Sequence, residues 1–239
     1  MTSKARSNSR SASPILAKLK RITKLLQQEK PTLTEERNSR HKPLDLLILL
    51  ILNQSTSDAL SDRAFAQLKK DYSSYEAILK ENNPQKLTKS IQVCGLAPTK
   101  SIYVLNALSF LERNYTLDIA MPYIDTLSDQ EALKLITSIK GVGIKSASCL
   151  LMFGFKRSTF AIDTHIFRIL KRLGGLVPEK ANTEQLHYLL QPIITSKIAF
   201  TLHVGLVEHG RAICHARKPL CHQCILSKEC DFYKEIVKK

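Results

Sequence analysis

Four of the six cysteines of this 239-residue chain lie close together near its C-terminal end. Their spacing is C-x6-C-x2-C-x5-C, so the four thiols can converge in space, and thiolates bind soft metal ions or iron–sulfur clusters. Zinc sites usually combine two short C-x2–4-C arms, whereas only one spacing here is short, and the pattern therefore favours an iron–sulfur cluster modestly over zinc. A disulfide knot is a weaker alternative, because a chain of this length can bury a hydrophobic core without cross-links. The candidate ligands are Cys214, Cys221, Cys224 and Cys230.

A glycine-containing turn, Gly141-Val142-Gly143, joins two stretches of helical pattern and is followed almost at once by Lys145. Glycines allow a tight turn, and the unpaired N–H groups at the start of the second helix could bind a phosphate. The pattern indicates a helix-hairpin-helix that contacts the DNA backbone, with an ordinary interhelical turn as the alternative. Lys145 falls in the first turn of the second helix, where the helix dipole disfavours an ammonium, and an uncharged amine there would be a nucleophile. A solvated lysine or a simple phosphate contact is the alternative for Lys145.

Asp163 is the only acidic residue between Glu131 and Glu179, a segment that holds eight basic residues. A carboxylate in such surroundings stays ionised and would stabilise positive charge that develops nearby. Asp163 also precedes an apolar helical run, so it is a candidate helix N-cap. Capping and catalysis are compatible at this position.

Helical periodicity runs through most of the chain, and no stretch alternates with the period of a β-strand. The segment 43–54 is apolar on nearly every side and predicts a central buried helix. Capping signals at Asn83, before Pro84, and in the box Ser128 to Glu131 mark the starts of two further helices. The fold class is therefore all-α. The expected helices span 15–26, 43–54, 58–70, 75–80, 84–93, 99–113, 128–139, 144–153, 164–173, 183–190 and 197–209.

The composition is basic, with 36 Lys and Arg against 21 Asp and Glu, a formal net charge of +15. Such a surplus favours a polyanionic partner, because basic surfaces release counterions from phosphates, although a merely soluble basic protein has the same charge. Hydrophobic residues make up 44%, which excludes wholesale disorder. The longest apolar run, Leu46 to Leu52, is far below the roughly 20 residues of a membrane span, so no membrane association is expected. The Ser-rich residues 1–14 predict a disordered basic arm, and an organelle transit peptide has the same composition.

Taken together, these motifs resemble the endonuclease III family of base-excision DNA glycosylases, within the helix-hairpin-helix superfamily. The resemblance extends from about Leu16 to the C-terminal end and keeps the order of the family's motifs. Its specific parts are the cysteine spacing and the hairpin followed eighteen residues later by Asp163. The other matching segments are Gln54 to Asp58, Gly95-Leu96 with Lys100, Ile162 to Arg168, His209-Gly210-Arg211 and Arg217-Lys218-Pro219.

The resemblance implies an all-α, two-lobed protein with duplex DNA bound between the lobes. A six-helix barrel domain is expected over 35–157, with the helix-hairpin-helix near 131–153. An iron–sulfur cluster domain is expected over 15–34 plus 158–239, with a [4Fe–4S] cluster loop at 214–230. A monomer is the expected form, and the compartment would follow the genome that is repaired: the cytoplasm or nucleoid in a bacterium, the nucleus or mitochondrion in a eukaryote.

Residue by residue, the resemblance implies that Lys145 is the nucleophile and Asp163 the catalytic aspartate. Gln54 matches a residue that fills the gap left by a flipped base, and Leu96 matches a wedge on the other strand. The remaining implied positions are the cluster ligands Cys214, Cys221, Cys224 and Cys230, the hairpin glycines Gly141 and Gly143, and the backbone-contacting pair Arg217 and Lys218.

The implied activity is that of a bifunctional glycosylase/AP lyase, which removes oxidised or ring-saturated pyrimidines from duplex DNA and cuts 3′ to the abasic site through a lysine Schiff base. A mismatch-specific thymine or adenine glycosylase and a non-catalytic, metal-containing DNA-binding protein are the alternatives. The chain departs from the family in having Lys140, where proline is common before the hairpin glycines.

Overall fold

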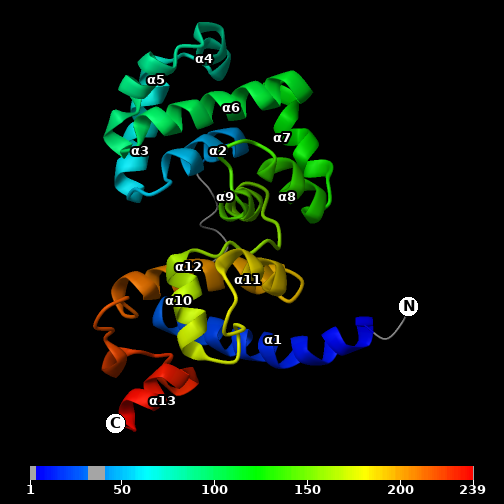
Figure 1. The fold of residues 1–239 in the computed structure, drawn as a ribbon, viewed down its shortest axis with the longest axis vertical. Coiled ribbons are helices and arrows are strands. Elements are labelled where there is room, and N and C mark those ends of the chain that lie inside the picture. The colour runs from blue at the N-terminus through cyan, green and yellow to red at the C-terminus, as the bar shows by residue number, and fades with distance from the viewer. Residues whose placement is uncertain (1–3, 32–40, 239) are drawn as a thin grey trace. The chain divides into compact units, whose positions relative to one another are not determined.

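The computed structural model describes residues 4–31 and 41–238, which form helices and connecting turns without a strand (Figure 1). The chain divides into two compact units, one made of residues 39–155 and the other of 1–38 together with 156–239. The division expected from the sequence was between residues 34 and 35 and between 157 and 158. No helix within the described ranges is long and apolar enough to cross a membrane.

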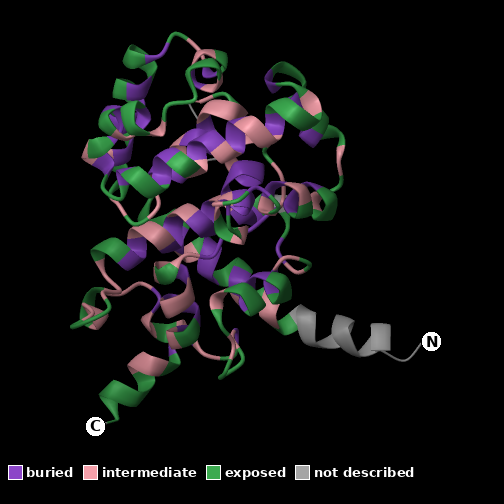
Figure 2. Cartoon of the chain, turned by 45° about the horizontal axis from the view of Figure 1, so that its top comes forward, coloured by how far each residue is buried: buried purple, intermediate pink, exposed green. Residues whose placement is uncertain are grey.

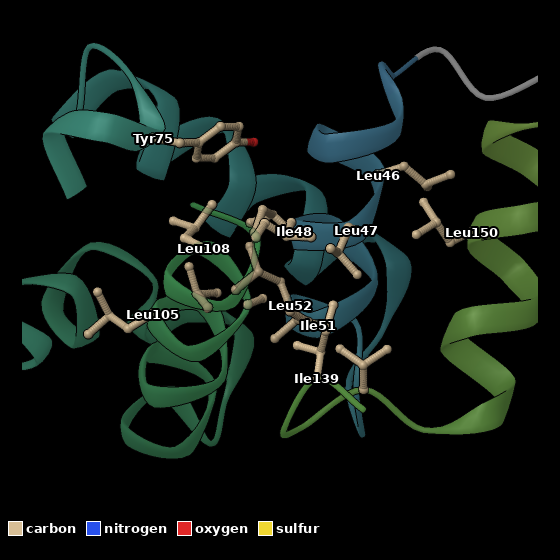
Figure 3. Packing of buried hydrophobic residues seen from close by; sticks show 14 of the residues in the cluster. Leu46, Leu47, Ile48, Ile51, Leu52, Tyr75, Leu105, Leu108, Ile139 and Leu150 are labelled. Carbon is tan, nitrogen blue, oxygen red and sulfur yellow. The ribbon is translucent and has the colours of Figure 1, made fainter. Parts of the chain in front are cut away.

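The unit of residues 39–155 is built around helix α2 (Pro43–Leu52). Its side chains Leu47, Ile48, Ile51 and Leu52 are completely buried (Figure 3). Each buried side chain of this kind stabilises the fold by about 1.5–3 kcal/mol. Helix α2 contributes several of them because it carries apolar residues on nearly all sides. The surrounding elements are α3 (Asp58–Asp71), α4 (Tyr75–Glu81), α5 (Pro84–Ser90), η1 (Gln92–Cys94), α6 (Ala97–Tyr115), α7 (Leu117–Thr126), α8 (Asp129–Thr137), α9 (Ile144–Cys149) and the π-helical turn η2 (Leu150–Gly154).

Side-chain caps fix the starts of the short helices in this unit. The hydroxyls of Ser57 and Ser74 accept hydrogen bonds from backbone N–H groups of α3 and α4, and the Asn83 side chain accepts one from α5. Ser128 and Glu131 form the reciprocal capping box that the sequence predicts for α8. These bonds satisfy N–H groups that the first turn of a helix leaves unpaired, so the polar residues between the helices specify where each one begins.

Two helices were absent from the sequence-based prediction. Helix α7 contains Pro122, which removes one backbone donor and normally argues against a helix. The helix forms nevertheless, because its buried residues Leu117, Met121 and Ile124 pack into the core and the Glu112 carboxylate accepts a hydrogen bond of 2.9 Å from the Leu117 N–H. The second is α13 (Asp231–Val237), which begins directly after the last cysteine.

The other unit combines the N-terminal helix α1 (Lys4–Glu29) with the C-terminal third of the chain. Helix α1 packs against α12, α12 packs against α10, and α10 packs against α13. Leu19, Ile22 and Leu26 of α1 are buried. Most helices of both units show one buried and one exposed face (Figure 2). The elements are α10 (Thr164–Leu173), α11 (Thr183–Leu190), α12 (Ser196–Ala212), η3 (Cys221–Gln223), η4 (Ser227–Glu229) and α13.

Residues 4–14 differ from the prediction of a disordered arm over residues 1–14, since α1 begins at Lys4 and continues through Pro14. Once a helix has nucleated, further residues add backbone hydrogen bonds, so the packed part of α1 can extend toward the N-terminal end, although Pro14 has no N–H to contribute. The segment before Pro14 contains no glycine to interrupt it. Residues 1–3 of the expected arm lie outside the described residues.

Removing side-chain volume from the middle of α2 tests its role in the core. Leu47→Ala is expected to lower the free energy of unfolding by about 2–5 kcal/mol, because it leaves a cavity in a fully enclosed site. Leu49→Ala, on the same helix but only partly buried, is the matched control and should cost less. Urea unfolding followed by circular dichroism measures both, and equal losses would contradict the enclosure of α2.

Candidate functional site

The turn between α8 and α9 has the form that the glycine pattern predicts. Two residues of this turn, Ile139 and Val142, are buried, and the Val142 N–H donates to the Ile139 carbonyl at 2.9 Å. Gly141 has φ +97°, and a Cβ at this position would overlap the Tyr103 ring, so only glycine fits. A Cβ at Gly143 would meet open space. Contacts within the chain therefore require glycine at position 141 and leave the surface beside position 143 free for close approach.

Lys145 is exposed and is the second residue of α9, as the sequence predicts. Gly143, which precedes the helix, has no side chain, and no side chain caps the start of α9. The first N–H groups of a helix have no partner within the helix, so the turn that carries Lys145 also offers free donors. Ala147, Ser148 and Cys149 are buried and fix the helix that carries the lysine.

Gln54 lies beside the hairpin turn, although 87 residues separate it from Gly141. The Gln54 side-chain nitrogen donates a hydrogen bond of 2.8 Å to the Gly141 carbonyl. The loop that carries Gln54 follows α2 directly, and its neighbour Asn53 donates to the Asp58 carboxylate at 2.9 Å. The structure thus joins two segments that the sequence analysis treats as separate motifs.

Leu96 is exposed to 61% and has a left-handed backbone, with φ +50° and ψ 28°. A left-handed conformation costs a non-glycine residue roughly 1–2 kcal/mol, and an exposed leucine gains nothing from burial to offset it. Leu96 follows Gly95, which also has a positive φ of +68°. The arrangement presents a large apolar side chain to solvent at the start of α6, which suits insertion between stacked bases.

Lys100 is a site residue to which the sequence analysis assigns no role. Its side chain is exposed to only 1%, and its Nζ donates hydrogen bonds of 2.7 Å to the Leu52 carbonyl and 2.9 Å to the Cys94 carbonyl. In the sequence, this lysine falls on the face of α6 that also carries buried residues such as Val104 and Leu111, and that spacing indicates burial. Periodicity alone would have marked this position as a core position.

In the other unit, Asp163 is half-buried and caps α10, because its Oδ1 accepts a hydrogen bond of 2.7 Å from the Ile166 N–H. The extended segment before it is clamped by Gln191, which accepts from the Phe160 N–H and donates to the Ser158 carbonyl, both at 3.0 Å. The capping that the sequence predicts is confirmed. It uses one carboxylate oxygen and holds the carboxylate at the start of a rigid helix.

Two arginines of α10 donate hydrogen bonds to the backbone around the first of the four clustered cysteines. Arg168 donates to the Cys214 carbonyl at 2.8 Å and to the Gly210 carbonyl at 3.1 Å. Arg172 donates to the His215 carbonyl at 2.7 Å, and its second terminal nitrogen donates to the Ala216 carbonyl at 3.0 Å. The helix that begins at Asp163 therefore also anchors the cysteine loop.

The four candidate ligands line one small cavity, and all six cysteines of the chain are free thiols, so there is no disulfide knot among them. Arg172 approaches the Cys214 sulfur at 3.2 Å. Burial, together with the neighbouring thiols, raises the pKa of the Cys224 thiol to about 11. One buried and three partly buried thiols around a single cavity fit a bound cationic metal centre, because it would stabilise all four as thiolates.

Among the described residues, no group of three or more histidine, cysteine or acidic side chains is arranged to hold a metal ion. Soft thiol donors around one cavity are of the kind that bind zinc or an iron–sulfur cluster.

Arg217 and Lys218 are exposed within the cysteine loop, and Lys218 has a positive φ of +51°. The loop is fixed on both sides of this pair. The Leu220 N–H donates to the Ile213 carbonyl at 3.0 Å, and Ala216 is held by Arg172. The two basic side chains thus extend from an anchored backbone.

The predicted site residues divide between the two units. Residues 39–155 contain Gln54, Leu96, Gly141, Gly143 and Lys145, of which Gln54 and Gly141 are in direct contact. The second unit contains Asp163, Arg217, Lys218 and the four cysteines that share one cavity.

Comparison with known proteins gives consistent matches. The family model described as "HhH-GPD superfamily base excision DNA repair protein" matches residues 48–193. A putative DNA glycosylase of Arabidopsis thaliana is 33% identical over 175 residues, which are 73% of this chain and 59% of that protein's length. Endonuclease III of Escherichia coli is 31% identical over 221 residues, which are 92% of this chain and 98% of that protein. A solved structure of a trapped endonuclease III–DNA covalent intermediate has a TM-score of 0.76 at 22% identity and covers 93% of this chain and 98% of that one.

The two glycines of the hairpin turn should differ in their tolerance of a methyl group. Gly141→Ala is expected to cost about 1–3 kcal/mol of folding free energy, because it combines a positive φ with overlap on Tyr103. Gly143→Ala, at a helix N-cap with an ordinary φ, should cost under about 1 kcal/mol. Chemical unfolding of both variants measures the difference, and the opposite order would refute the turn geometry.

Proposed function

The chain belongs to the endonuclease III family, within the HhH-GPD superfamily of base excision DNA repair proteins, and on that premise we propose that it is a bifunctional DNA glycosylase and abasic-site lyase. The proposed substrates are oxidised or ring-saturated pyrimidines in duplex DNA. The observation that carries the proposal is the position of Lys145, exposed at the uncapped start of α9 directly after the hairpin turn.

In the proposed mechanism the damaged nucleotide is first extruded from the duplex, because its C1′ atom is inaccessible within the stack. The Lys145 amine then attacks C1′ while the bond from C1′ to the base breaks and the base leaves with the bonding electrons. The attacking nitrogen releases one proton, and opening of the sugar ring, in which O4′ takes up a proton to become a hydroxyl, gives a protonated imine between Lys145 and C1′. The imine acidifies the C2′ protons, and loss of one of them expels the 3′ phosphate and cuts the strand.

Asp163 is proposed to stabilise the positive charge that develops on the sugar as the base departs. Its cap on α10 engages Oδ1 and fixes the carboxylate, so no reorganisation is needed during the reaction. Capping and charge stabilisation are thus proposed to act through the same side chain.

The proposed partner is double-stranded DNA that contains damaged bases or abasic sites. The net charge of +15 supports this, because Lys and Arg side chains gain binding energy by displacing counterions from phosphates. Gln54 and the hairpin are joined by a hydrogen bond, and Leu96 presents an exposed apolar tip. These are features that base extrusion uses: a polar side chain to fill the vacated space and an apolar wedge to separate the stack.

Cys214, Cys221, Cys224 and Cys230 are proposed to hold a [4Fe–4S] cluster. The support is a set of four soft donors that line one cavity, at a spacing in which only one pair of cysteines is close. When bound, such a cluster supplies four covalent anchor points for its loop. Arg217 and Lys218 lie in that loop, so the chain's own contribution there is to hold two cations in place against a phosphate backbone.

Replacement of the proposed nucleophile should remove catalysis without removing DNA binding. Lys145→Ala is expected to reduce nicking of abasic duplex DNA to the uncatalysed rate, because the amine that forms the Schiff base is lost. Gel assays of nicking and of duplex affinity measure the two properties. Lys140→Ala, an exposed lysine of the same turn, is the control and should retain nicking. Normal nicking by Lys145→Ala would exclude this residue as the nucleophile.

Asp163→Asn separates capping from charge. Asparagine caps helices as well as aspartate does, so the melting temperature should stay unchanged, whereas base release should slow by about 100-fold or more because the charge is lost. Asp163→Ala removes both roles and should also cost about 1 kcal/mol of stability. Single-turnover base release and thermal unfolding are the measurements, and full activity of the asparagine variant would limit Asp163 to capping.

A further inference from the structure

Lys100 joins two loops that are distant in sequence. Its Nζ donates to the carbonyls of Leu52 and Cys94, and the first of these lies 48 residues away. Because both hydrogen bonds end on one nitrogen, the two carbonyl oxygens can be no farther apart than the sum of the two bond lengths. One side chain therefore fixes the separation between the end of α2 and the end of η1.

The two acceptors are carbonyls that the backbone leaves unpaired. Leu52 is the last residue of α2 and Cys94 the last of η1, and neither carbonyl accepts a backbone hydrogen bond from the described residues. Both residues are fully buried, so water does not replace the lysine. A buried carbonyl without a partner is costly, and a positive group at the C-terminal end of α2 also interacts favourably with the helix dipole.

Each acceptor lies two residues before a side chain proposed to enter DNA. Gln54 follows Leu52, and Leu96 follows Cys94. The contact with the second loop is double, because the Lys100 backbone N–H donates to the Leu96 carbonyl at 3.0 Å. Gln54 in turn is bonded to the hairpin through Gly141. A continuous set of hydrogen bonds thus connects the loop that carries Leu96, through Lys100, with the loop that carries Gln54.

We propose that Lys100 is a positioning residue that sets the spacing between Gln54 and Leu96, so that both side chains enter the duplex at one damaged nucleotide. The inference rests on the proposed function, since it assigns to these two side chains their role at the extruded base. Lys100 is enclosed and touches no DNA itself. Its removal should weaken recognition of damage, which needs both insertions at once, while general attraction to phosphates continues.

The test compares affinity for a duplex that contains a tetrahydrofuran abasic-site analogue with affinity for the same duplex undamaged. The ratio of the two affinities is the damage preference. Lys100→Met is expected to lower this preference by about tenfold, the effect of losing an interaction as strong as a hydrogen bond to a charged group. Affinity for the undamaged duplex should change by less than about twofold, because surface charges dominate it.

Controls separate positioning from stability. Leu111→Ala, buried farther along α6, destabilises the same helix without touching either loop and should leave the preference unchanged. Lys89→Met makes the same chemical change at an exposed lysine and should also leave it unchanged. Lys100→Arg, which keeps the charge and the donors, should restore part of the preference. If Lys100→Met does not fold, Lys100→Gln, which retains one donor group, is measured under the same criteria.

A double-mutant cycle tests whether Lys100 acts through the wedge. In a Leu96→Ala background, Lys100→Met should reduce the damage preference far less than in the wild type, because coupled residues are not additive. Additive effects, or a preference in Lys100→Met equal to that of Leu111→Ala, would overturn the positioning role and leave Lys100 as a core contact. A wild-type protein with no damage preference would instead overturn the proposed function itself.

Discussion

The burial of α2 is the constraint on which the unit of residues 39–155 depends. Helix α2 is apolar on all sides and packs against α3, α6, α9 and η2, so one element fixes the positions of all four. Its C-terminal end supplies the Gln54 loop and the carbonyl that Lys100 binds. Helix α9, with Lys145 in its first turn, is held against the same core. A side chain on a surface turn can be placed reproducibly only if such a buried support lies beneath it.

In the second unit, the guanidinium groups of two arginines fix the backbone that leads into the cysteine loop. Arg168 and Arg172 of α10 donate hydrogen bonds to four carbonyls at and after the end of α12, those of Gly210, Cys214, His215 and Ala216. A planar group with five donors can satisfy several carbonyls of one loop at once. The same helix begins at Asp163, so the placement of the carboxylate and of the cysteine loop depends on one rigid element.

Much of this fold could be predicted from the sequence, because its signals are local. The all-α class and the starts of α5 and α8 followed from periodicity and from the capping residues Asn83 and Ser128. Helix α7 was not predicted, because Pro122 is a local signal against a helix. Packing of the helix in the core outweighs this signal. Helix α1 differs from the arm expected over residues 4–14, since a Ser-rich composition low in apolar residues gives no sign of a helix extended from its packed part.

The site residues show the same division. The types and spacing of Lys145, Asp163 and the cysteines mark them in the sequence, and family resemblance assigns their roles. The bond from Gln54 to Gly141 and the bond from Lys100 to Leu52 could not be predicted, because each joins segments more than forty residues apart. No local pattern records such a contact. Long-range hydrogen bonds of this kind turn a set of recognisable motifs into one site.

The central claim is that the amine of Lys145 becomes covalently attached to C1′ of the damaged nucleotide. The most direct measurement is reduction with borohydride during reaction on a duplex with an abasic site or thymine glycol, followed by proteolysis and mass mapping of the cross-linked peptide. The account predicts one adduct, on Lys145 in the peptide that follows the hairpin turn. An adduct on another amine, or base release without any adduct, would contradict it.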